Sequence, residues 1–189
     1  MRFEDDSVLR LYKQTIQDFC LYPGLELTPQ QYDALLKAAS EMSAKMRAVR
    51  IVSATNVSAR DLEQRLIRKG EDPVHAREAV SWMEDLSLLD DRKTAQQIVD
   101  RCIAKGYGVS RAKQALYEKR IPKELWDEVL EDYPDQTDKI LAYLQMKLPD
   151  LRDEKAVRKV TDALLRRGHS YSQIRSAMRQ LDVELQEEF

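Results

Sequence analysis

The sequence is poor both in residues that interrupt regular structure and in residues that cross-link a chain. It has five glycines and six prolines in 189 residues, too few for a fold with many tight turns. Its two cysteines, Cys20 and Cys102, are too few for a disulfide framework or a cysteine-rich zinc site. We therefore expect an all-α fold in a reducing, cytoplasmic setting.

Long apolar runs are missing as well. The sequence has no stretch of about eighteen apolar residues, the length a membrane helix needs, and no apolar run follows the acidic start at residues 1–6. These features predict a chain that neither spans a membrane nor is secreted. The formal net charge of −2 excludes a strongly basic protein, so any contact with nucleic acid must depend on local patches.

One pattern, in which a helix-ending signal is followed at once by a helix-starting signal, occurs three times, at residues 56–66, 106–116 and 168–178. Each copy begins with a residue that tolerates the left-handed conformation at a helix end. Two positions later comes a residue that can cap a new helix, and between them lies a position suited to a hydrophobic staple. The triplets are Asn56-Val57-Ser58, Gly106-Tyr107-Gly108 and Gly168-His169-Ser170. This repetition predicts a helical repeat protein.

Other start and stop signals divide the chain into a small N-terminal segment, irregular or partly β, and three helical repeats. Thr28 and Gln31 predict a capping box that opens a long first helix ending near Ser53. Extra length around Pro149 divides the front of the third repeat into two helices, and a short last helix is expected at 182–189. The predicted parts are residues 1–27, 28–89, 90–134 and 135–189.

Two stretches are basic although the whole chain is not. Residues 98–120 hold six basic and two acidic side chains, and residues 150–181 hold eight basic and four acidic ones. Residues 122–132 hold five acidic side chains against Lys123 alone, so stacked repeats would present a basic side and an acidic side. Such runs are either ordinary solvated helix faces or a binding stripe, and the sequence leaves both open.

The candidate binding residues come from the two basic stretches. Arg175 and Arg179 are one helical turn apart and share a face, while Tyr171 is either a packing residue or a stacking surface. We expect residues 152–179 to carry more of the partner contact than the N-terminal segment does. The full set is Arg101, Lys105, Arg111, Lys113, Arg158, Lys159, Arg166, Arg167, Tyr171, Arg175 and Arg179.

Patterns typical of an enzyme or a metal site do not occur. His75 and His169 have no short spacing to another metal ligand, and the staple position of His169 favours a packed structural role. Gly106-Tyr107-Gly108 lacks the further glycine, the Gly-Lys-Ser/Thr sequence and the preceding strand of a phosphate-binding loop. We therefore expect no catalytic residue, no metal and no cofactor, and we expect chelators to leave folding unchanged.

Four short segments make the chain resemble the RecX family, the bacterial regulators of the RecA recombinase. Glu71 and Thr94 differ from the large apolar or aromatic residues that this family usually has at these positions. The segments, in the family's order, are SARDLEQRLIRKG at 58–70, LLDD at 88–91, KGYG at 105–108 and RRGHSY at 166–171.

The resemblance implies a curved, elongated body of three-helix repeats that lies in the groove of the RecA–single-stranded DNA filament. It also implies a non-enzymatic regulator, expected to be an inhibitor, that restrains strand exchange, ATP hydrolysis and coprotease activity. We expect a monomer whose partner is the RecA filament, with weak direct binding of single-stranded DNA as a further option. Two other functions stay open: a helical nucleic-acid-binding module and a protein-binding scaffold unrelated to recombination.

Overall fold

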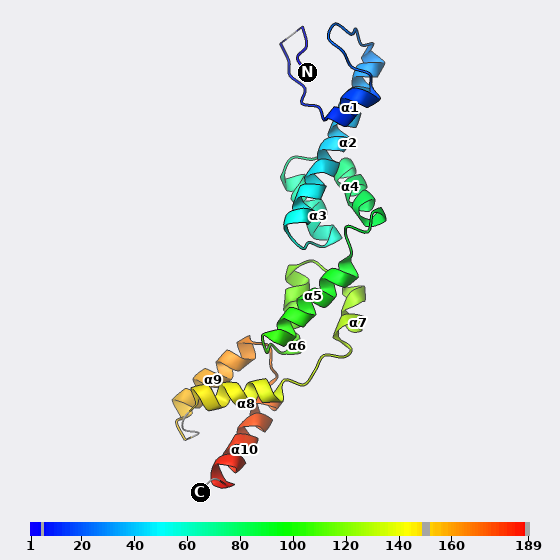
Figure 1. Ribbon diagram of the computed structural model, residues 1–189. Helices are drawn as coiled ribbons and strands as arrows, with labels where there is room; N and C mark the ends of the chain where they lie inside the picture. The colour runs from blue at the N-terminus through cyan, green and yellow to red at the C-terminus, as the bar shows by residue number, and fades with distance from the viewer. Residues whose placement is uncertain (5, 149–151, 188–189) are drawn as a thin grey trace. The chain divides into compact units, whose positions relative to one another are not determined.

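The computed structural model describes residues 1–4, 6–148 and 152–187, and the regular structure of these residues is helical (Figure 1). The prediction of an all-α fold is confirmed. The chain divides into two compact units, unit 1 (Met1–Asp90) and unit 2 (Asp91–Phe189). The predicted division of the third repeat around Pro149 falls on a residue outside the described ranges.

The N-terminal segment of unit 1 is mostly irregular, as predicted. It contains an isolated antiparallel bridge between Arg2 and Val8. It also contains one short helix that the sequence signals did not predict, α1 (Lys13–Asp18). The Phe3 and Tyr32 rings form a T-shaped pair, with 5.4 Å between centroids, and this contact joins the segment to the helix that follows.

Three helices form the body of unit 1: α2 (Pro29–Ala54), α3 (Ala59–Arg68) and α4 (Pro73–Asp85). The predicted capping box at the start of α2 is confirmed. The Thr28 hydroxyl accepts from the Gln31 N–H, and the Gln31 side chain accepts from the Thr28 N–H. Small residues of α2 pack against larger side chains of α3 and α4, which lets the helices approach closely. The most buried members of this core are Ala44, Ala48, Leu62, Leu66, Ala76, Ala79 and Met83.

The first copy of the repeated pattern ends its helix differently from the other two. Gly106 and Gly168 have φ angles of +64° and +88°, in the left-handed region as predicted. The prediction for Asn56 is wrong, because α2 ends at Thr55, whose backbone is extended at φ −151° and ψ 143°. The Thr55 hydroxyl donates to the Ile51 carbonyl. An extended β-branched residue thus ends the helix without a left-handed turn, and the chain runs on to the Ser58 cap.

The first half of unit 2 holds α5 (Asp91–Ala104), α6 (Val109–Glu118), the 3₁₀ turn η1 (Lys123–Leu125) and α7 (Trp126–Leu130). Gly108 occupies the N-cap of α6, as predicted. The helix expected after Pro122 is split between η1 and α7, with the Trp126 indole N–H donating to the Ile121 carbonyl at 3.1 Å. Buried Ile98, Leu116 and Val129 form the core of this half.

The second half of unit 2 holds α8 (Thr137–Lys147), α9 (Glu154–Arg166) and α10 (Tyr171–Glu187). Ser170 and Gln173 form the predicted reciprocal cap, with N–H bonds of 3.0 and 3.2 Å. The expectation of a separate helix at 182–189 is wrong, because α10 continues through Glu187 without a glycine or proline to end it. None of the described helices combines the length and the apolar character needed to cross a membrane.

Candidate interaction surfaces

The two halves of unit 2 meet where the turns at 106–108 and 167–169 approach each other. The Gly108 N–H donates to the Arg167 carbonyl at 2.9 Å. The His169 Nε2–H donates to the Gly106 carbonyl at 3.1 Å. We call this region, residues 106–111 together with 167–169, the junction. The first bond joins two backbone groups and the second comes from the His169 ring. Together they satisfy the Gly108 N–H and the carbonyls of Arg167 and Gly106 across the contact.

Glycine is needed at the junction because two backbones touch there. A Cβ atom added to Gly108 would overlap the Gly168 carbonyl and lie 2.6 Å from the His169 nitrogen. A Cβ atom added to Gly168 would overlap the Arg111 nitrogen and lie 2.6 Å from the Arg111 Cβ. The sequence offers one reason for glycine at these positions, which is helix capping. The structure adds a second reason, because the two backbones lie too close together for a side chain.

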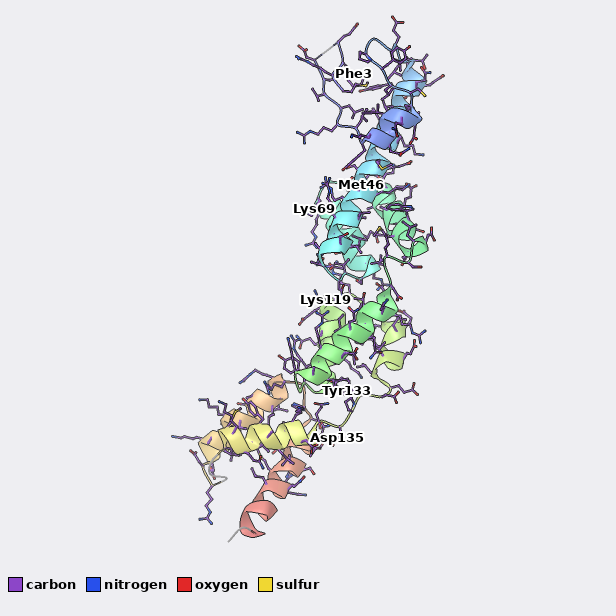
Figure 2. All side chains as sticks on the ribbon, in the orientation of Figure 1. Phe3, Met46, Lys69, Lys119, Tyr133 and Asp135 are labelled. Carbon is purple, nitrogen blue, oxygen red and sulfur yellow. The ribbon has the colours of Figure 1, made fainter. Side chains whose placement is uncertain are left out.

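Two of the candidate cations are engaged inside the junction. The Arg167 guanidinium carbon lies 4.8 Å from the centre of the Tyr143 ring and 5.8 Å from that of Tyr107, distances typical of cation–π contacts. The Arg111 Nη1 lies 3.0 Å from the Glu118 Oε1. Tyr107 is itself fixed, because the Tyr133 hydroxyl (Figure 2) donates to its carbonyl at 2.6 Å. Arg167 therefore contacts rings from both halves of unit 2, while Arg111 is paired within α6.

His169 has the packed structural role that its staple position predicts. Its side chain is buried, and Nδ1 has no hydrogen-bond partner among the described residues. Burial lowers the pKa of His169 and the nearby Arg167 charge lowers it further, while the bond to the Gly106 carbonyl acts in the opposite direction. The imidazole is therefore held neutral, with its proton on Nε2.

A small cavity of about 170 Å³ lies between α5 and α6, and we call it the α5–α6 hollow. Arg101, Lys105 and Arg111 line it together with Cys102, and Lys119 (Figure 2) contributes as well. Burial raises the pKa of the Cys102 thiol, an effect that the three surrounding candidate cations oppose. The structure thus brings together three candidates, Arg101 from α5, Lys105 from the turn after α5, and Arg111 from α6.

Lys113 does not join the α5–α6 hollow, although it is close to Arg111 in the sequence. It lines a separate groove between α6 and α7, whose other charged residues are Asp127, Glu128 and Glu131. Acidic side chains offset its charge there, which makes Lys113 the weakest of the candidates for an anionic partner.

The remaining candidates lie on the exposed sides of α9 and α10. Lys159 and Arg166 are seven residues apart and share one flank of α9, and Arg175 and Arg179 share a face of α10. None of the basic side chains in this set forms an ion pair of 4.0 Å or less with a side chain that the structure describes. We call the set the α9–α10 surface, and its members are Arg158, Lys159, Arg166, Tyr171, Arg175 and Arg179.

Arg158 and Tyr171 line the same groove, which runs between α9 and the start of α10. The apolar side chains of Val157 and Leu165 also line it, together with the acidic side chains of Glu154 and Asp162. Tyr171 is 61% exposed, so the alternative in which it packs into the core is wrong. Its ring is available for stacking against a partner.

A further basic groove lies in unit 1 between α2 and α3, and the sequence analysis missed it. It is lined by Arg47, Arg50, Arg65 and Lys69 (Figure 2). These cations lie on α2, on α3 and at the C-cap of α3. Residues 45–69 hold seven basic and two acidic side chains, so a charge run does mark them. The spacing of Arg47 and Arg50, three residues apart on one helix, is a second signal that could have found part of the groove.

Some of the charge in this groove is already balanced within unit 1. The Arg47 Nε lies 2.7 Å from the Glu71 carboxylate, whose side chain is 6% exposed, and the Ser43 hydroxyl donates to the same oxygen. Arg65 pairs with Asp61 at 2.9 Å. The Glu71 charge is therefore buried without being left unpaired, and Arg50 and Lys69 remain the exposed cations of the groove.

Comparison with known proteins identifies the family. The family model described as RecX, second three-helix domain, matches residues 90–130. A regulatory protein RecX from Streptococcus gordonii is 26% identical over the whole of this chain and 74% of its own length. Another from Vibrio parahaemolyticus is 26% identical over 75% of this chain and 94% of its own length. The chain belongs to the RecX family.

Solved RecX structures share this fold. A crystal structure of regulatory protein RecX has a TM-score of 0.70 at 19% identity and covers 93% of this chain and 91% of that one. The crystal structure of RecX from Lactobacillus salivarius has a TM-score of 0.68 at 21% identity, over 77% of this chain and 99% of that one. The helical repeats described above are therefore those of the RecX fold. The segment matched by the family model includes the α5–α6 hollow.

Proposed function

We propose that this chain regulates a RecA recombinase by binding the RecA–single-stranded DNA filament, without catalysing a reaction itself. Binding restrains strand exchange, ATP hydrolysis and coprotease activity, and the regulator acts as a cytoplasmic monomer. Membership of the RecX family supports this proposal, as do relatives that carry the name regulatory protein RecX.

The α9–α10 surface is the observation that carries the proposal. Its five cations are exposed and form no ion pair with a described side chain. They can pair with acidic or phosphate groups of a partner without first giving up a contact inside the molecule. Because the whole chain has a net charge of −2, the attraction is local and orients the protein on its partner more than it raises overall affinity.

Tyr171 favours single-stranded DNA as one component of the partner surface. An exposed aromatic ring beside arginine side chains suits an unpaired base, whose face stacks on the ring while the cations meet the phosphates. Arg158 shares a groove with Tyr171, and Arg175 follows it by one helical turn. Direct binding of naked single-stranded DNA is weak in this account, because one ring and a few charges offer a small contact.

The test is to titrate the protein into a RecA reaction and to measure ATP hydrolysis dependent on single-stranded DNA. The proposal predicts that the rate falls with dose, and that the filament is bound more tightly than naked DNA at each salt concentration. Tight binding to naked duplex DNA with a steep salt dependence and an unchanged ATPase rate would instead indicate a nucleic-acid-binding module. An unchanged rate without binding to the filament or to DNA would indicate a scaffold for another partner.

A further inference from the structure

Three metal-ligating side chains meet on the seam between α2 and α4. Glu41 comes from α2, and His75 and Glu78 come from α4. One ligand atom of each lies within 4.8 Å of the others. Glu78 follows His75 by three residues, which places both on the same face of α4. The three-residue spacing of His75 and Glu78 is visible in the sequence and was missed there, whereas Glu41, which is distant in the sequence, joins the pair only in the folded chain.

A neighbouring hydroxyl orients the imidazole within the cluster. The Ser40 Oγ lies 2.8 Å from the His75 Nδ1, across 35 positions of sequence. When Nδ1–H donates to this oxygen, the lone pair of Nε2 is free to bind a cation. This is the arrangement in which protein histidines usually hold a metal, with one nitrogen on the ion and the other on a fixed acceptor.

The surroundings of the cluster allow an ion to enter. Glu41 and His75 are partly buried, whereas Glu78 is exposed. The one competing contact of Glu41 among the described ion pairs is Lys37, at 3.9 Å. A pair of this length with an exposed lysine is weak, so a divalent cation can displace it.

We propose that Glu41, His75 and Glu78 form a binding site for a divalent transition-metal ion such as Zn²⁺, with water completing its coordination. One imidazole nitrogen and two carboxylate oxygens suit zinc and its neighbours in the first transition row. Mg²⁺ and Ca²⁺, which prefer oxygen ligands alone, bind there more weakly. The ion clamps α2 to α4, and it stabilises unit 1 because it binds the folded form only.

The experiment uses the full chain with Cys20→Ser, which removes an exposed thiol that would also bind zinc. Calorimetric titration with Zn²⁺ is expected to give one site, and Mg²⁺ is expected to bind far more weakly. Co²⁺ is expected to give an absorption spectrum of bound metal. Thermal melts are expected to show a higher melting temperature in the presence of Zn²⁺.

Variants then assign the ligands. His75→Ala, Glu41→Gln and Glu78→Gln are each expected to weaken zinc binding by at least about tenfold, and Ser40→Ala by about tenfold through loss of the orienting bond. Asp85→Asn removes an exposed carboxylate two helical turns beyond Glu78 and is expected to leave affinity unchanged. Circular dichroism confirms the fold of each variant. The inference is overturned if the parent binds no zinc at millimolar concentration, or if the folded Glu78→Gln protein binds it with the parent's affinity.

Discussion

The junction and the α9–α10 surface are built from the same residue types and use them in opposite ways. In the junction, Arg167 lies against the rings of Tyr143 and Tyr107, and Arg111 pairs with Glu118. On the α9–α10 surface, arginines and a tyrosine point to solvent, and the cations have no ion-pair partner among the described side chains. Residue type therefore does not show whether a side chain holds the fold together or is free to bind a partner. The tertiary contacts of the side chain show it.

Neighbouring residues show the difference most clearly. Arg166 and Arg167 are adjacent, yet Arg166 is exposed at the end of α9 while Arg167 turns into the junction. A partner can form an ion pair with Arg166 without disturbing the protein. An ion pair with Arg167 would require breaking contacts that hold the two halves of unit 2 together.

Opening the junction is expected to have the largest effect on stability. Gly168→Ala places a Cβ atom against the backbone nitrogen and the Cβ of Arg111, and relief of that overlap separates the two turns and weakens the Gly108–Arg167 bond. We expect a loss of about 3 kcal/mol in the free energy of unfolding, measured by urea denaturation.

Gly70→Ala is the matched control for this substitution. Gly70 has a φ of +90°, but a Cβ there meets no atom within 4 Å, so only backbone strain of about 1–2 kcal/mol is expected. Equal losses in the two variants would show that the close approach at the junction contributes nothing.

Substituting the adjacent arginines tests the contrast within one turn of helix. Arg167→Ala removes a cation from two aromatic rings and is expected to cost about 1 kcal/mol of stability. Arg166→Ala removes an exposed charge and is expected to cost less than about 0.5 kcal/mol. Chemical denaturation of both variants measures the difference. A larger loss for Arg166→Ala would mean that their assigned roles are reversed.

The smallest effect expected is a pH dependence that originates in the junction. Because the folded protein lowers the pKa of His169 from its ordinary value of 6.5, the unfolded chain binds more protons just below that value, and stability falls as the pH falls through it. We expect the melting temperature to decrease by a few degrees from pH 7.5 to pH 5.5. His169→Phe is expected to reduce this decrease, and an identical decrease in both proteins would exclude His169 as its source.

Local signals were sufficient to predict most helix ends. The caps at Thr28, Ser58 and Ser170 depend on residues within three positions, and such interactions can be read from a sequence. The prediction of a left-handed Asn56 was wrong because the helix already ends at the preceding residue, Thr55, whose backbone is extended. The helix at α1 was missed because its six residues carry little periodic signal.

The candidate site could be predicted only as a set of charges. The sequence supplied the eleven candidate residues but not which of them the fold already uses. Glu118, the ion-pair partner of Arg111, lies seven positions away. The two rings that contact Arg167 belong to α8 and to the turn between α5 and α6. The unit 1 groove lies in a basic stretch, residues 45–69, that the sequence analysis missed. Glu41 reaches the His75–Glu78 pair only through the packing of α2 on α4.

The most direct test of the account compares two double charge reversals for binding to the RecA–single-stranded DNA filament. Lys159→Glu/Arg166→Glu alters the α9–α10 surface, and Arg101→Glu/Lys105→Glu makes the same change in net charge at the α5–α6 hollow. We expect the first to weaken binding by about 2 kcal/mol or more, roughly thirtyfold in Kd, and the second to have a much smaller effect, with circular dichroism confirming both folds. Unchanged binding by the folded Lys159→Glu/Arg166→Glu protein, together with loss of binding by the other, would contradict the account and assign the contact to the α5–α6 hollow.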